Sequence, residues 1–151
     1  MFAATRSLLK MKQMSKMNSM LLNQSRFFAV SKKFTKTHEW IEFDSDTNIA
    51  TLGITDHAQA ELGDIVHVDL PEVGTEFTKN EVLVCIESVK TAADIYQMVD
   101  GEVVEINESL ADDSSVINSD AEGQGWVMKV KLSDPSQMDE LLGEDQYKDI
   151  L

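Results

Sequence analysis

A lysine-bearing turn between two apolar segments constrains the fold of this chain more than any other feature. Residues 82–86 are apolar and rich in β-branched side chains, and Ile95 and Tyr96 follow after a short polar stretch. Both flanks have the composition of strands and are too short to be helices. The sequence therefore predicts a tight β-hairpin with Val89 and Lys90 near its tip.

An internal repeat surrounds this hairpin. Residues 63–69 (Gly-Asp-Ile-Val-His-Val-Asp) match residues 101–107 (Gly-Glu-Val-Val-Glu-Ile-Asn) in character at each position. After each copy a polar bend leads to an apolar pair, Val82-Leu83 in the first and Val116-Ile117 in the second. The repeat predicts a mainly β fold in which two small antiparallel sheets pack face to face with approximate two-fold symmetry, as a sandwich/barrel hybrid.

The remaining segments predict the other elements of this fold. Two strands with a turn between them are expected near residues 40–43 and 49–54, and another strand over residues 126–132. Strict alternation over residues 64–70 predicts a strand with Ile65, His67 and Asp69 on one side. Thr55 or Asp56 begins a short internal helix that Gly63 ends. Pro135 in a first turn predicts a C-terminal helix over residues 134–151.

The charge of the chain separates it into two pieces. Residues 1–36 carry eight of the 13 Lys and Arg residues and no acid, whereas residues 37–151 carry five bases and 27 acids, a formal balance of −22. Residues 1–30 are therefore typical of a mitochondrial transit peptide, followed by one domain over residues 31–151. We expect a mitochondrial matrix protein.

Two partner classes are disfavoured by the composition. The basic segment could alternatively be a tail that binds nucleic acid, but the acidic body behind it would be repelled by phosphates. No apolar run approaches the roughly 20 residues that a membrane helix needs. We expect neither a nucleic acid nor a membrane as partner.

Residues for self-contained catalysis are not grouped in the sequence. His38, His57 and His67 are scattered, and no pair has the spacing of metal ligands. The lone Cys85 lies in an apolar strand, which favours a small buried hydrophobe over a reactive thiolate. We therefore predict no catalytic residue and no metal ligand, although a linear search does not detect residues that meet only in space.

A lysine at a hairpin tip can instead be an attachment point. Acylation of the ε-amine of Lys90 would remove its charge and fix a long flexible arm to the protein. A rigid hairpin would make this anchor protrude, so that the arm could reach several enzymes. The alternative is an unmodified lysine that only improves solubility.

Several short blocks, in order over residues 34–151, carry a family resemblance. They resemble the H-protein family of the glycine cleavage system in His38-Glu39-Trp40 and in residues 53–59, 62–66, 70–74, 87–90, 101–105, 125–126 and 141–142. The resemblance implies a lipoyl-carrier fold and lipoate in amide linkage to Lys90. It also implies that the protein is a carrier and not an enzyme.

The same resemblance implies the partners and the other site residues. An aminomethyl group from glycine would be loaded onto the arm by glycine decarboxylase, unloaded by aminomethyltransferase, and the reduced dithiol would be reoxidised by dihydrolipoyl dehydrogenase. A lipoyl-attaching enzyme would modify Lys90. Glu39 and Asp94 are the positions expected to hold the amino group of the loaded arm, because a cationic adduct requires a carboxylate acceptor.

Two alternatives stay open. Lipoyl domains of 2-oxoacid dehydrogenases usually carry Asp-Lys-Ala and biotin carriers Met-Lys-Met, and Val89-Lys90-Thr91 fits neither well. An unmodified interaction protein of the same fold would use its acidic face for binding.

Met98 stands where the family usually has proline, which leaves the turn before Gly101 less constrained.

Overall fold

The computed structural model of this 151-residue chain describes residues 30–151. They include a compact unit that runs from Ser31 to Leu151. The transit peptide expected over residues 1–30 lies, apart from Val30, outside the described residues. Within residues 30–151, none of the helices combines the length and the apolar character needed to cross a bilayer.

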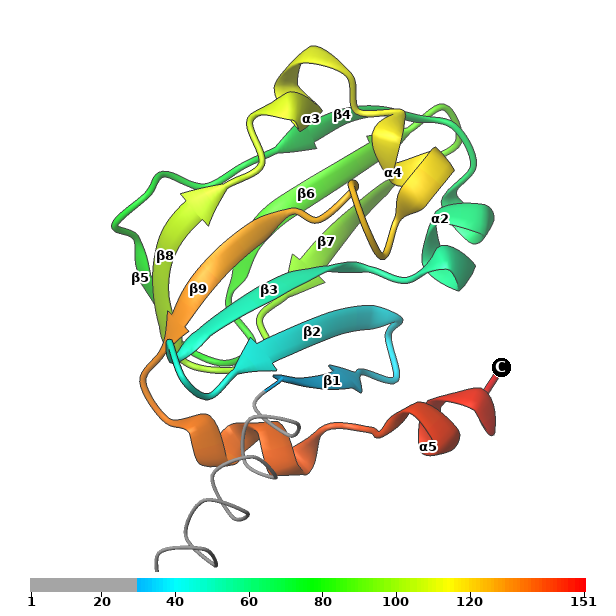
Figure 1. Ribbon diagram of the computed structural model, residues 1–151. Helices are drawn as coiled ribbons and strands as arrows, with labels where there is room; N and C mark the ends of the chain where they lie inside the picture. Colours follow the sequence, from blue (N-terminus) through cyan, green and yellow to red (C-terminus); the bar gives the residue numbers. More distant parts are fainter. Residues whose placement is uncertain (1–29) are drawn as a thin grey trace, which may run out of the picture. The chain divides into compact units, whose positions relative to one another are not determined.

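The described chain is mainly β and forms two sheets (Figure 1). Every strand pair with a defined register is antiparallel. The larger sheet has six strands in the order β1 (Val30–Phe34), β2 (Glu39–Asp44), β3 (Ile49–Ile54), β9 (Met128–Leu132), β8 (Gly101–Ile106) and β5 (Glu76–Phe77). The smaller sheet has the order β4 (Ile65–Asp69), β6 (Val82–Ser88) and β7 (Ala92–Tyr96).

The two copies of the repeat lie in different sheets, β4 in the smaller and β8 in the larger. The prediction of two antiparallel sheets is thus confirmed, but the sheets are unequal in size. The reason is that the second copy does not continue as the first does. Val82 begins strand β6, whereas Val116 begins helix α4 (Val116–Asp120).

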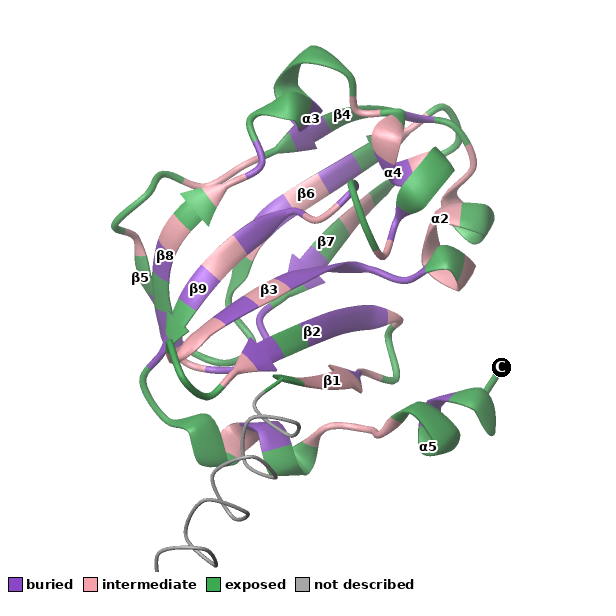
Figure 2. Ribbon diagram, in the orientation of Figure 1, coloured by how far each residue is buried: buried purple, intermediate pink, exposed green. Residues whose placement is uncertain are grey.

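The core lies between the two sheets. Ile41 and Val130 of the larger sheet and Val84 and Ile86 of the smaller one are at most 1% exposed and belong to one apolar cluster. Figure 2 shows buried residues recurring along β2, β3, β9 and β6. Burial of each such side chain contributes about 1.5–3 kcal/mol, so this core fixes both sheets as a rigid base for the loops at their ends.

The strict alternation predicted for residues 64–70 is wrong. Ile65 and Val68 are both buried, while Val66 and His67 between them are exposed. The pairing of β4 with β6 shifts register between Ile65 and His67. A β-bulge adds one residue and reverses the alternation after it, which lets both apolar side chains face the core.

The internal helix forms as predicted. Helix α2 (Asp56–Leu62) begins after Thr55, whose hydroxyl accepts the Ala58 amide at 3.2 Å, and ends at Gly63 with φ 78°. Helices α3 (Ser109–Asp112) and α4 complete the set between β8 and β9. Figure 1 shows α2 and α4 side by side, and they also contact each other.

A single C-terminal helix over residues 134–151 does not form. The segment is divided into a 3-10 helix, η1 (Pro135–Glu140), and a short helix, α5 (Glu144–Lys148). Between them Leu141 is extended, and Leu142 exchanges two backbone hydrogen bonds with Phe34 at 2.8 and 2.9 Å. Pairing with the β1 end interrupts the helix and places Tyr147 of α5 in a stacked contact with Phe34.

Candidate functional site

The hairpin predicted around Lys90 is present and tightly closed. Strands β6 and β7 pair up to Glu87 and Ala92, and the Ser88 amide donates to the Thr91 carbonyl at 2.7 Å. The Ser88 hydroxyl accepts from the amides of Lys90 and Thr91 at 3.2 and 3.1 Å. The Ser88 side chain therefore provides the hydrogen-bond acceptor for two backbone amides of the turn that carries Lys90, and it stabilises the conformation of this turn.

The tip is also tied to the chain that follows α2. The Val89 amide donates to the Asp64 carbonyl at 2.9 Å. Beside this bond the Asn118 amide group donates to the Gly63 carbonyl at 2.8 Å, and its oxygen accepts the Ile65 amide at 2.9 Å. Asn118 of α4 thus supports the segment on which the hairpin tip rests.

Lys90 itself is exposed and forms none of the ion pairs found within residues 30–151. Its aliphatic stem lies across Gly63, where an added Cβ would meet Lys90 Cε at 3.2 Å. Gly63 combines φ 78° with ψ −153°, a conformation nearly restricted to glycine. The missing side chain at Gly63 therefore leaves room for the stem of Lys90.

A cavity of about 350 Å³ lies beside the base of this tip. The segment before β2, helix α2 and strand β7 contribute its walls, which are mostly apolar in surface. The lining residues are Thr37, His38, Glu39, Ile54, Ala58, Glu61, Leu62, Thr91, Ala93, Asp94, Ile95 and Tyr96. Glu39 and Asp94, which are 55 positions apart in the sequence, thus line one cavity. Its lining also includes Thr91, the residue after Lys90.

Glu39 has the environment of a preorganised acceptor. It is only 3% exposed, and one carboxylate oxygen, Oε2, accepts hydrogen bonds from the hydroxyls of Thr35 and Thr37. Its other oxygen, Oε1, accepts none from residues 30–151. A buried carboxylate with one open oxygen suits a cationic donor, since a buried charge requires a partner.

Asp94 also lines this cavity and is exposed. It faces Cys85 across the β6–β7 pair. Burial, and after it the charge of Asp94, raises the pKa of the Cys85 thiol above its ordinary value. The raised pKa favours the protonated thiol near neutral pH. Cys85 is half-buried, whereas the sequence favoured a buried side chain.

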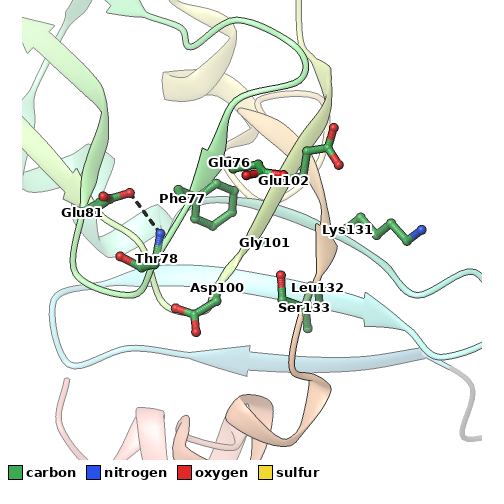
Figure 3. Close-up of a pocket in the computed structure, with 10 residues that line it drawn as sticks. All are labelled: Glu76, Phe77, Thr78, Glu81, Asp100, Gly101, Glu102, Lys131, Leu132 and Ser133. Atoms are coloured by element: carbon green, nitrogen blue, oxygen red, sulfur yellow. Dashed lines mark hydrogen bonds between the residues drawn. The ribbon is translucent and has the colours of Figure 1, made fainter.

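A larger cavity, of about 600 Å³, opens at the other end of β6 (Figure 3). Figure 3 shows several carboxylates around it, and that of Glu81 accepts the Thr78 amide at 3.0 Å. Its lining residues are Glu76, Phe77, Thr78, Glu81, Asp100, Gly101, Glu102, Lys131, Leu132 and Ser133. Glu81 precedes β6 and Lys90 follows it, so the seven-residue strand separates this cavity from the lysine by about 20 Å.

The sequence did not reveal several residues that build the site. Thr35, Thr37 and Asn118 act through hydrogen bonds to residues distant in the sequence or to a buried carboxylate. The scattered histidines also prove to be neighbours in part, because the rings of His38 and His57 lie 4.3 Å apart between centroids. Only the fold brings Asn118 to residues 63–65 and His38 to His57. Thr35 and Thr37 lie within four positions of Glu39, so threonines close to the acid were the available signal for that contact.

A small β domain of two antiparallel sheets, with a lysine on a hairpin tip held by hydrogen bonds, has the architecture of lipoyl-carrier proteins. A solved structure supports this class. The crystal structure of a glycine cleavage system H protein from Mycobacterium marinum superimposes with a TM-score of 0.71 at 33% identity, covering 79% of this chain and 94% of that one.

The family model of the glycine cleavage H-protein matches residues 32–151, and the chain belongs to this family. The H protein of Thermotoga maritima is 51% identical over 118 residues, which are 78% of this chain and 94% of that protein. The H protein of Bartonella tribocorum is 48% identical over 118 residues, 78% of this chain and 95% of that protein. The family resemblance of the sequence is thus confirmed, and with it the carrier role in glycine cleavage.

Proposed function

We propose that Lys90 is the lipoyl-bearing residue of this chain and that the protein shuttles the aminomethyl group of glycine without catalysing a reaction itself. The observation that supports Lys90 is its position. It is an exposed amine without an ion pair among residues 30–151, on a turn braced from two sides, at the edge of a cavity that contains a buried carboxylate.

The residues present fit a lipoyl arm. When attached, lipoate supplies the dithiolane that accepts the aminomethyl group and the two electrons of the decarboxylation. The hydrogen bonds of Ser88 fix the turn that carries the attachment point, and Gly63 leaves room beside it for the lysine stem. The mostly apolar cavity gives the arm a surface to lie against, and it excludes water from a bound adduct.

Glu39 and Asp94 are proposed to hold the amino group of the loaded arm. Oε1 of Glu39 would accept a charge-assisted hydrogen bond from the cationic amine, while Thr35 and Thr37 keep Oε2 in place. Asp94, which lines the same cavity, would add a second negative charge there. Both carboxylates favour the loaded state over the unloaded one.

The partners follow from this chemistry. Glycine decarboxylase would load the arm, aminomethyltransferase would unload it and dihydrolipoyl dehydrogenase would reoxidise it, after a lipoyl-attaching enzyme had modified Lys90. With a basic, acid-free segment over residues 1–36, we place the protein in the mitochondrial matrix after removal of a transit peptide.

The proposal is tested by intact mass and peptide mapping of the chain from lipoylation-competent cells. One lipoyl group on the peptide that contains Lys90 is expected. Lys90→Arg should abolish both lipoylation and glycine–bicarbonate exchange with glycine decarboxylase, because a guanidinium does not replace the amine as acyl acceptor. Lys79→Arg is the matched control, since Lys79 is also on a turn but is paired with Glu140 at 2.6 Å.

Three results would refute parts of this proposal. A lipoyl group on another lysine, or normal exchange with the Lys90→Arg chain, would remove Lys90 from the site. A lipoylated chain that supports no exchange would indicate a carrier for another pathway. An unmodified chain from competent cells would indicate an interaction protein.

A further inference from the structure

Two of the three histidines of the chain meet beside the cavity. His38 precedes β2 and His57 lies in α2, and their ring centroids are 4.3 Å apart with an interplanar angle of 44°. Glu61, one turn after His57, places Oε1 at 3.0 Å from His57 Nε2. One ligand atom from each of His38, His57 and Glu61 lies within 4.8 Å of the other two.

A hydrogen-bond relay fixes the ring of His38. Tyr147 donates its hydroxyl proton to Thr55 Oγ1 at 2.8 Å, so its oxygen is left to accept from His38 Nδ1–H, also at 2.8 Å. This tautomer leaves the lone pair of His38 on Nε2. A histidine whose second nitrogen donates to a fixed partner is the usual arrangement of a metal-binding histidine.

The backbone of His38 has an unusual conformation. Its φ is +70°, in the left-handed region that few residues other than glycine adopt. The His38 carbonyl accepts the Thr55 amide at 2.9 Å, and its amide donates to the Thr35 carbonyl at 3.2 Å. These bonds keep the ring on the α2 side, against His57.

We propose that His38, His57 and Glu61 form a binding site for one divalent cation of the zinc class. Two imidazoles and one carboxylate are a donor set that Zn²⁺ takes in four-coordinate sites with one position open. His38 and Glu61 also line the cavity beside Lys90. Cation binding there would oppose a cationic occupant of that cavity, a consequence that rests on the proposed function.

The chain contains its own control for an ordinary histidine–carboxylate contact. His67 Nε2 lies 2.8 Å from Asp69 Oδ1, but both side chains are more than half exposed. Within residues 30–151, no third histidine, cysteine or acid lies close enough to this pair to form a metal-binding group. His67→Ala should therefore leave zinc binding unchanged, whereas His57→Ala should weaken it.

The test is titration of the full chain with Zn²⁺ against a chelator of known affinity. We expect one Zn²⁺ per chain, with affinity at least about tenfold lower in His57→Ala and His38→Ala. Tyr147→Phe, which removes the hydroxyl that His38 and Thr55 share and leaves the three ligands, should lower the affinity about tenfold. Co²⁺ should give the intense visible bands of a four-coordinate site in the wild type and not in His57→Ala. Thermal unfolding confirms that each variant is folded.

The outcomes separate this site from the proposed function. The Lys90→Arg chain should bind Zn²⁺ as the wild type does, because Lys90 is not a ligand. Cys85→Ser should also bind normally. The proposal is overturned if the wild type takes up no stoichiometric Zn²⁺, if His67→Ala weakens binding as much as His57→Ala, or if Cys85→Ser abolishes it.

Discussion

Glu39→Gln tests whether one buried charge retains the loaded arm. The amide has the size of the carboxylate and can still accept from Thr35 and Thr37, so the wall of the cavity should keep its shape. With its oxygen toward the two threonines, the amide presents its NH2 group at the open position, so the variant loses both the negative charge and the acceptor there. Lipoylation of Lys90 should proceed normally, because the amine lies outside the cavity.

The magnitude follows from the type of hydrogen bond that changes. A hydrogen bond to a charged group contributes about 1.5–3 kcal/mol. The exchange removes one such bond, so it weakens docking of a cationic amine by about 1.5–3 kcal/mol. Since 1.4 kcal/mol is tenfold, and water attacks the adduct only when it is undocked, its lifetime should fall about tenfold to hundredfold.

The measurement is the decay of the loaded protein in buffer. The lipoylated chain is loaded with glycine and glycine decarboxylase, the enzyme is removed, and the adduct is followed by intact mass. Glu42→Gln is the matched control, because Glu42 is on the same strand but exposed. A Glu39→Gln adduct that decays within twofold of the wild type, or a Glu42→Gln adduct that decays equally fast, would contradict the docking role.

Other variants test the hairpin support and the thiol. Gly63→Ala should lower the free energy of unfolding by about 1–3 kcal/mol in chemical denaturation, because the conformation of Gly63 is nearly restricted to glycine. It should also slow the measured rate of lipoylation, because the added Cβ would displace the stem of Lys90. Asn118→Ala removes three side-chain hydrogen bonds, so the free energy of unfolding should fall by about 2–3 kcal/mol in the same assay. Because the pKa of Cys85 is raised, its alkylation at pH 8 should be slower than that of a free cysteine, should accelerate as the pH rises, and should be faster in Asp94→Asn; a rate equal to that of free cysteine would contradict the shift.

Local patterns predicted those parts of the fold that local interactions determine. The hairpin around Lys90 and the capped helix α2 depend on residue type and spacing within a few positions. The division into two antiparallel sheets was predicted from the internal repeat, whose two copies lie in different sheets. The bulge in β4 was missed because alternation alone does not show where a strand must accommodate an extra residue. The break after Glu140 was missed because it depends on pairing between Leu142 and Phe34, which are distant in sequence.

The candidate site was predictable only where a single residue defines it. Lys90 is identifiable from its turn, but the cavity needs the segment before β2, helix α2 and strand β7 together. Glu39 and Asp94 entered as expectations through the family resemblance, and the structure places both on that cavity. The contact between His38 and His57 had no counterpart in their spacing, because it depends on the left-handed backbone at His38.

The proposed attachment at Lys90 and the proposed docking at Glu39 rest on different sets of bonds, and this makes them separable by mutation. The tip of the hairpin is held by Ser88 and by the Asp64 carbonyl, with Asn118 behind it. The carboxylate in the cavity is held by two threonines that precede β2. Hydrogen bonds without shared partners contribute nearly independently. The arm of a carrier must extend toward its partner enzymes and return to the cavity between visits. Two independent sets of hydrogen bonds allow each position to be stabilised without weakening the other.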